Sequence, residues 1–110
     1  MATLVPPSAL QILERTLDAV RIRANTDGEI FGSEIMDAMR DAGCHLGVDR
    51  LEVLLTKTVL LRAMESLGES YPAELLQNHE TRMRVSDAAK YLREAIEWTG
   101  RQKAAEKVAI

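Results

Sequence analysis

Residues 49–67 constrain the fold more than any other part of this chain, because apolar side chains surround the segment on most of its sides. Asp49 and Glu52 form a carboxylate version of the capping box that starts a helix, and Gly68 is a typical residue beyond a helix end. The apolar positions between them are Leu51, Val53, Leu54, Leu55, Val59, Leu60, Leu61, Met64 and Leu67. Such a helix must be covered on several sides. We therefore expect it at the centre of the core, with a second subunit covering whatever the other helices leave exposed.

The composition favours helices over strands and one domain over several. Of the 110 residues, 46% are hydrophobic and 28% are charged, as in folded globular proteins. The only aromatic residues are Phe31, Tyr71, Tyr91 and Trp98. Because strands are rich in aromatic side chains, so few of them favour a core of aliphatic side chains on helices. We expect an all-α fold, a compact bundle of four main helices plus one short helix, as a single domain over residues 1–100.

Capping residues and hydrophobic spacing give the expected bounds of the other elements. Ser8 with Gln11 predicts a capping box before an apolar repeat, and Ser33 is a candidate cap for the next helix. Gly43 and Gly100 are placed where left-handed residues end helices. The expected helices cover residues 9–24, 33–42, 49–67, 73–77 and 86–99, with a strand-like segment over 81–85 and a frayed tail over 101–110.

The polar segment between the first two expected helices resembles the loop of an EF-hand. Counting back from Glu34 as the twelfth loop position, the matching residues are Asn25, Asp27, Gly28, Glu29, Ile30 and Glu34. The resemblance covers residues 9–42 and implies a helix-loop-helix with oxygen ligands from Asn25, Asp27, the Glu29 carbonyl and Glu34. Arg23 departs from the family pattern, since it places a cation at the first ligand position. The interpretation that we favour is a polar turn without a metal ligand.

A second segment repeats the spacing of this loop without its ligands. Aligned by a shift of about 55 residues, residues 78–89 place Val85 opposite Ile30, the eighth loop position. Paired EF-hand loops join through a short antiparallel bridge at that position. We therefore expect a minimal two-strand contact between residues 29–31 and 83–85.

The sequence contains no recognisable catalytic motif. Cys44 and His45 are neighbours that would point in different directions, and no second Cys completes a zinc site. Glu34, Asp37 and Asp41 lie on successive turns, as acidic residues on solvated helices often do. We assign no catalytic, cofactor-binding or metal-binding residue, and we expect no enzymatic activity. A lone Cys, the absence of a signal-like N-terminus and the absence of a long apolar run favour a cytoplasmic protein without membrane insertion.

Three functions remain, and we favour the first. The apolar helix and the missing chemistry favour a non-enzymatic interaction or regulatory accessory protein that binds a protein partner or another copy of itself, as in a homodimer. The second is a winged-helix DNA-binding regulator in which residues 49–67 would be the recognition helix. The third is a calcium-binding module of EF-hand type, with Asn25, Asp27, Glu29 and Glu34 as its ligands.

Charge disfavours the DNA-binding interpretation. Residues 33–67 carry 4 Lys/Arg against 6 Asp/Glu, whereas a recognition helix must neutralise phosphates. The basic residues gather later in the chain, at Arg82, Arg84, Lys90, Arg93, Arg101, Lys103 and Lys107. Residues 81–110 hold 7 Lys/Arg against 4 Asp/Glu, and residues 1–80 hold 7 against 13. Nucleic-acid binding by Arg82, Arg84, Lys90 and Arg93 is an alternative that we do not favour.

Overall fold

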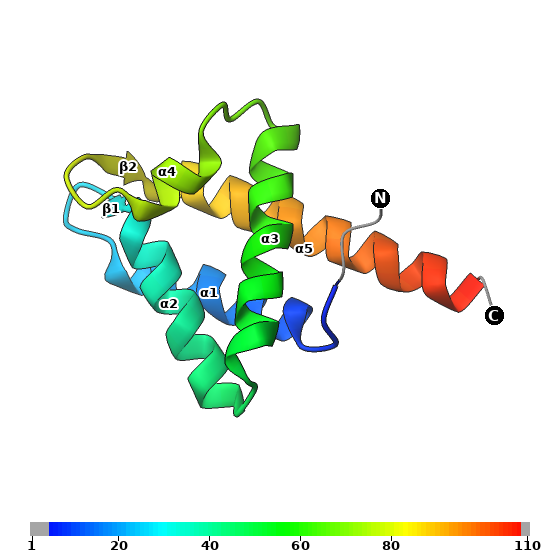
Figure 1. The fold of residues 1–110 in the computed structure, drawn as a ribbon. Helices are drawn as coiled ribbons and strands as arrows, with labels where there is room; N and C mark the ends of the chain where they lie inside the picture. The colour runs from blue at the N-terminus through cyan, green and yellow to red at the C-terminus, as the bar shows by residue number, and fades with distance from the viewer. Residues whose placement is uncertain (1–4, 109–110) are drawn as a thin grey trace.

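The described part of the chain folds into helices and one small two-stranded sheet, as expected for an all-α protein. The computed structural model describes residues 5–108, with side chains as far as residue 102 (Figure 1). The elements in order are α1 (Ala9–Arg23), β1 (Glu29–Phe31), α2 (Gly32–Leu46), α3 (Arg50–Ser66), α4 (Pro72–Gln77), β2 (Arg82–Arg84) and α5 (Val85–Val108). The expected long helix at the centre of the sequence corresponds to α3, and the short helix corresponds to α4.

The starts of α3 and α1 test two expected caps, and only one of them forms. Asp49 Oδ1 accepts the amide of Glu52 at 3.1 Å, which confirms the cap of α3. The expected capping box of Ser8 is wrong, because the Ser8 side chain makes no capping hydrogen bond. Its hydroxyl instead donates to Glu52 Oε1 at 3.2 Å. Ser8 therefore ties the start of α1 to the first turn of α3.

Helix α2 is longer at both ends than the sequence indicated. It begins at Gly32, so Ser33 is inside the first turn and is not its cap. Gly43 does not end α2, which continues to Leu46 and stops at Gly47, whose φ is 71°. Gly43 is buried, and a β-carbon there would lie 2.4 Å from the Val53 side chain. The missing side chain lets α2 and α3 approach closely beside their connection.

Helix α5 also continues past its expected end, because Gly100 lies inside the helix. Gly100 is exposed, and a β-carbon there would have no neighbour within 4 Å. Since glycine in a helix interior costs about 0.5–1 kcal/mol relative to alanine, Gly100→Ala should raise the free energy of unfolding by that amount. Urea titration followed by circular dichroism measures this gain. Gly47→Ala is the control and should destabilise, since its φ is 71°; a loss for Gly100→Ala would contradict the prediction.

The two strands pair as expected, but in a different register. Antiparallel β1 and β2 place Ile30 opposite Met83, so the expected pairing of Ile30 with Val85 is wrong by two residues. Val85 is already the first residue of α5, and its amide donates to the Gly28 carbonyl at 2.9 Å. The strand contact itself is confirmed between residues 29–31 and 82–84.

This register reveals two similar helix-strand-helix units. A shift of 53 residues carries β1 (29–31) onto β2 (82–84), and the start of α2 at 32 onto the start of α5 at 85. The same shift carries Asn25 onto Asn78, and each side-chain oxygen accepts two backbone amides of its own loop. The units α1-β1-α2 and α4-β2-α5 meet through β1-β2, through α1 on α5 and through α2 on α4. Helix α3 joins the units and packs against α5 and α1 (Figure 1).

One face of α3 enters the core, and another remains uncovered within this chain. The buried residues of α3 are Thr56, Val59, Leu60, Ala63 and Met64. Leu51 and Leu54 are 62% and 50% exposed. We expected the apolar side chains of this helix to be covered on several sides. Within the described part of the chain, only one side of α3 is buried in the core.

Candidate functional site

The loop expected to resemble a calcium site uses two of its oxygen atoms internally. Asn25 Oδ1 accepts the amides of Asp27 and Glu29 at 3.0 and 2.8 Å. The Glu29 carbonyl accepts the amide of Asn25 at 2.9 Å. Arg23, at the first ligand position, pairs with Asp41 at 2.6 Å. These bonds give the loop its shape without an ion, and they engage two of the four oxygen ligands that the resemblance implies, the Asn25 side chain and the Glu29 carbonyl.

The structure does not bring the acidic residues of α2 and Cys44 together into one site. Asp37 pairs with Arg40 at 2.9 Å, whereas Asp41 pairs with Arg23, so the acidic residues of α2 have different partners. Cys44 is exposed on α2. Among the described residues, no group of three or more His, Cys, Asp or Glu side chains is arranged to hold a metal ion.

Buried polar side-chain groups in the described part of the chain have hydrogen-bond partners. The hydroxyls of Thr16, Thr56 and Thr99 each donate to the carbonyl four residues earlier in their own helix. Tyr91 donates to Glu69 Oε2 at 3.2 Å, which ties the segment after α3 to α5. Burial, followed by the hydrogen bond and charge of Glu69, raises the pKa of Tyr91.

The arginines of β2 have neighbours within the sheet. The Arg82 guanidinium lies 4.4 Å from the centre of the Phe31 ring, its partner across the two strands. Arg84 lies opposite Glu29 in the same register. The Arg82 guanidinium therefore has an aromatic neighbour within the sheet, and both arginines remain exposed.

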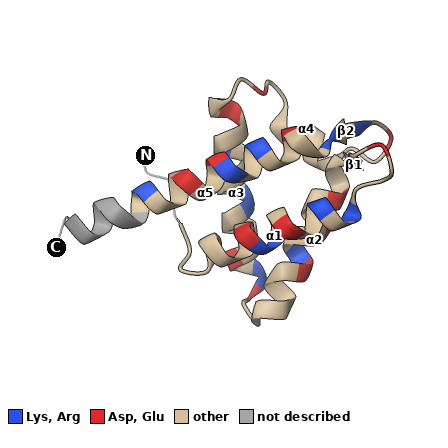
Figure 2. Cartoon of the chain, turned by 180° about the vertical axis from the view of Figure 1, so that it is seen from behind, with Lys and Arg blue, Asp and Glu red and all other residues tan. Residues whose placement is uncertain are grey.

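The basic residues of α5 alternate with acidic ones. Lys90 and Arg93 are exposed, but Arg101 pairs with Glu94 at 3.4 Å and with Glu97 at 3.9 Å. Seen from behind, the helix carries both charge signs along its length (Figure 2). The structure therefore gives no continuous basic face along the described part of α5, as phosphate binding would need.

A groove lies between α2 and α3. Its volume is about 550 Å³. The lining residues are Met36, Asp37, Arg40 and Cys44 from α2, Val48 from the connection, and Arg50, Val53 and Leu54 from α3. The two helices diverge from their short connection (Figure 1), which leaves this space between them. The groove therefore has apolar side chains along its length and charged side chains at its rim.

The bounds and the packing of α2 and α3 determine which of their residues line the groove. Because α2 continues to Leu46, the residues at positions 36, 40 and 44 repeat along one face of it. On α3, Val53 and Leu54 reach the groove while Leu60 and Met64 face the core. The groove was not predicted from the sequence, because α2 was expected to end at residue 42 and the pattern does not show which apolar residues of α3 the other helices leave exposed.

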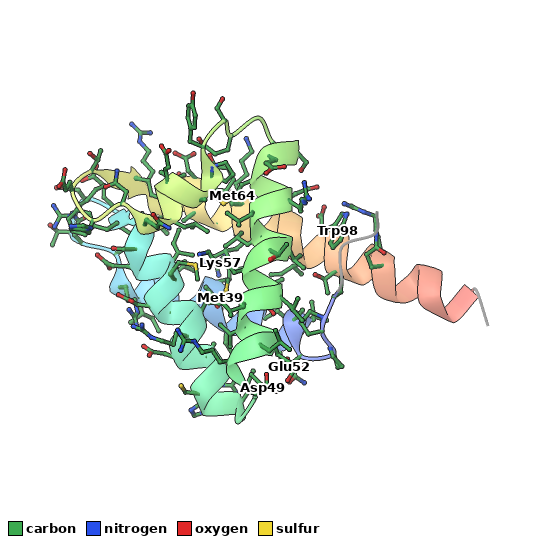
Figure 3. The ribbon with its side chains drawn as sticks, in the orientation of Figure 1. Met39, Asp49, Glu52, Lys57, Met64 and Trp98 are labelled. Carbon is green, nitrogen blue, oxygen red and sulfur yellow. The ribbon has the colours of Figure 1, made fainter. Side chains whose placement is uncertain are left out.

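The rim carries more cations than carboxylates. Arg40 is paired with Asp37, whereas Arg50 makes no ion pair within the described residues. Lys57 is half-buried and lies on the side of α3 that faces α2 (Figure 3). It also makes no ion pair with any described residue. The groove thus has a locally positive rim on a chain whose net charge is −3.

Comparisons of the chain with protein-family models, with curated proteins and with solved structures gave no match. Within the part of the chain that the structure describes, no helix combines the length and the apolar character that crossing a membrane requires.

Proposed function

We propose that this chain is a non-enzymatic protein-binding module, and that the groove between α2 and α3 takes the apolar face of a helix from a partner protein. The observation that carries the proposal is the uncovered side of α3. Leu54 is 50% exposed where it lines the groove, and Leu51, one turn earlier, is 62% exposed. Covering such side chains contributes about 25 cal/mol for each Å² of apolar surface removed from water.

The shape of the groove favours a helix over a small molecule. Small-molecule sites enclose most of their ligand and offer a few convergent polar groups. Here the polar side chains lie at an open rim, where Arg40 and Asp37 are 69% and 49% exposed. An apolar groove between two helices is a typical binding site for a partner helix, whose apolar residues are spaced three and four apart along one face.

The two alternative functions draw less support from the same geometry. Beside the exposed Arg50, helix α3 presents Leu51 and Leu54 to solvent, and leucine side chains neither pair with phosphates nor hydrogen-bond to base edges. The loop containing Asn25 engages its own oxygen atoms, so we propose that its EF-hand resemblance is architectural. A second copy of the chain is the alternative occupant of the groove.

A peptide titration tests the proposal. The probe is a synthetic amphipathic helix of about five turns with leucines three and four residues apart. Its addition should shift the amide resonances of α2 and α3 residues at the groove, and Leu54→Asp should weaken binding by about tenfold or more. Ile22→Asp is the matched control, because Ile22 is 85% exposed on α1 and does not line the groove. Equal weakening by both variants, or shifts confined to other elements, would contradict the proposal.

A further inference from the structure

Positive side chains outnumber negative ones at the groove, even after the ion pairs within the chain are counted. The cations near it are Arg40, Arg50 and Lys57, and the carboxylate in its lining is Asp37. Arg40 and Asp37 neutralise each other at 2.9 Å. Arg50 in the lining and Lys57 beside it have no ion pair among the described residues, so one positive charge in the groove and one next to it lack a carboxylate partner.

Nearby carboxylates of α3 do not compensate these charges. Asp49 Oδ1 accepts the Glu52 amide at the start of the helix. The Glu52 side chain accepts the Ser8 hydroxyl, and it lies on the side of α3 away from Lys57 (Figure 3). Arg50 and Lys57 are therefore free to pair with carboxylates of a partner.

We propose that the occupant of the groove is an acidic amphipathic helix of a partner protein, with Asp or Glu residues beside its apolar stripe. This inference rests on the proposed function of the groove. Arg50 and Lys57 are seven residues apart on α3, a rise of roughly 10 Å. Two carboxylates two turns apart on a partner helix have the same spacing, so they can face both cations while the apolar residues between them contact Leu54 and Val53.

The same charges disfavour a second copy of α3 as the occupant. The exposed leucines of α3 are accompanied by Arg50 and Lys57, which have no ion pair among the described residues, whereas Arg62 is paired with Glu65 at 3.4 Å. A second α3 laid in the groove would bring these cations toward the cations of the rim. Like charges placed across an interface oppose association and direct it to other partners. The charge pattern therefore favours a partner that is acidic where α3 is basic.

The experiment compares two fluorescent peptides that share one leucine stripe. One peptide carries Glu two turns apart beside the stripe and the other carries Lys at the same positions. At about 50 mM salt, the full chain should bind the Glu peptide about tenfold more tightly, and the preference should shrink at about 500 mM salt. Arg50→Glu combined with Lys57→Glu should reverse the preference. Lys90→Glu combined with Arg93→Glu is the matched control and should preserve it, since both are exposed residues of α5 without an ion pair among the described residues and neither lines the groove.

The outcomes separate the two proposals. Equal binding of both peptides that is lost in Leu54→Asp would overturn the acidic partner and leave the helix-binding groove intact. Binding of neither peptide, or binding unaffected by Leu54→Asp, would overturn the groove itself. A dimer in light scattering that dissociates in Leu54→Asp would also overturn the acidic helix, because it would assign the groove to a second copy.

Discussion

Gly32→Ala should lower the free energy of unfolding by about 3 kcal/mol or more, at or beyond the upper end of the usual cost of overpacking. A β-carbon at Gly32 would lie 1.8 Å from the Leu75 carbonyl oxygen and 2.8 Å from its carbon. Both atoms belong to the backbone of α4. The start of α2 is held against this helix by the Ser33 amide, which donates to the Asn78 carbonyl at 2.9 Å. Relief of the clash therefore requires α2 and α4 to separate.

Gly43→Ala is the matched control for this substitution. Its β-carbon would lie 2.4 Å from Val53 Cγ2, a side-chain atom that can move when the valine changes rotamer. We expect a loss of about 1 kcal/mol, and Val53→Ala in the same chain should recover part of it. Urea unfolding of the soluble variants, together with circular dichroism of any variant that fails to fold, measures both effects. Equal losses at Gly32 and Gly43 would contradict the assignment to the α4 backbone.

The main helices could be predicted because their signals are local. The cap at Asp49 and the dense apolar pattern after it depend on residues one or two turns apart, and α3 forms close to the expected bounds. The meeting of the two strand segments was also predictable. Its register was not, because a shift of 55 or 53 residues places similar residue types opposite Ile30. The Asn25 and Asn78 turns, which set the shift at 53, become evident only from their hydrogen bonds.

The predicted C-terminal ends of α2 and α5 were wrong because glycine was taken as the residue that ends a helix. Gly43, Gly47 and Gly100 all follow helical patterns, but only Gly47 has the positive φ that ends a helix. Gly43 is needed for the close approach of Val53. Gly100 lies on an exposed part of α5 and does not end the helix. Sequence alone does not separate these three uses of the same residue.

The groove could not be predicted because it depends on which apolar residues are left uncovered. Leu54 and Leu60 have the same side chain on the same helix, and the hydrophobic pattern treats them alike. Their burial is set by where α1 and α5 pack on α3 and by how α2 diverges from it. These are relations between distant segments. The sequence correctly singled out α3, whereas its exposed face required the structure.

The contrast between Leu60 and Leu54 provides the last prediction. Leu60 is 1% exposed, so Leu60→Ala should cost about 2–5 kcal/mol through lost burial and the cavity left behind. Leu54 is 50% exposed, and Leu54→Ala should cost less than about 1 kcal/mol. Urea titrations of the two variants give both values. Because both substitutions remove the same atoms from one helix, intrinsic helix propensity cancels between them. A loss at Leu54 as large as that at Leu60 would mean that Leu54 is covered in solution, and the groove would then not be free to receive a partner helix.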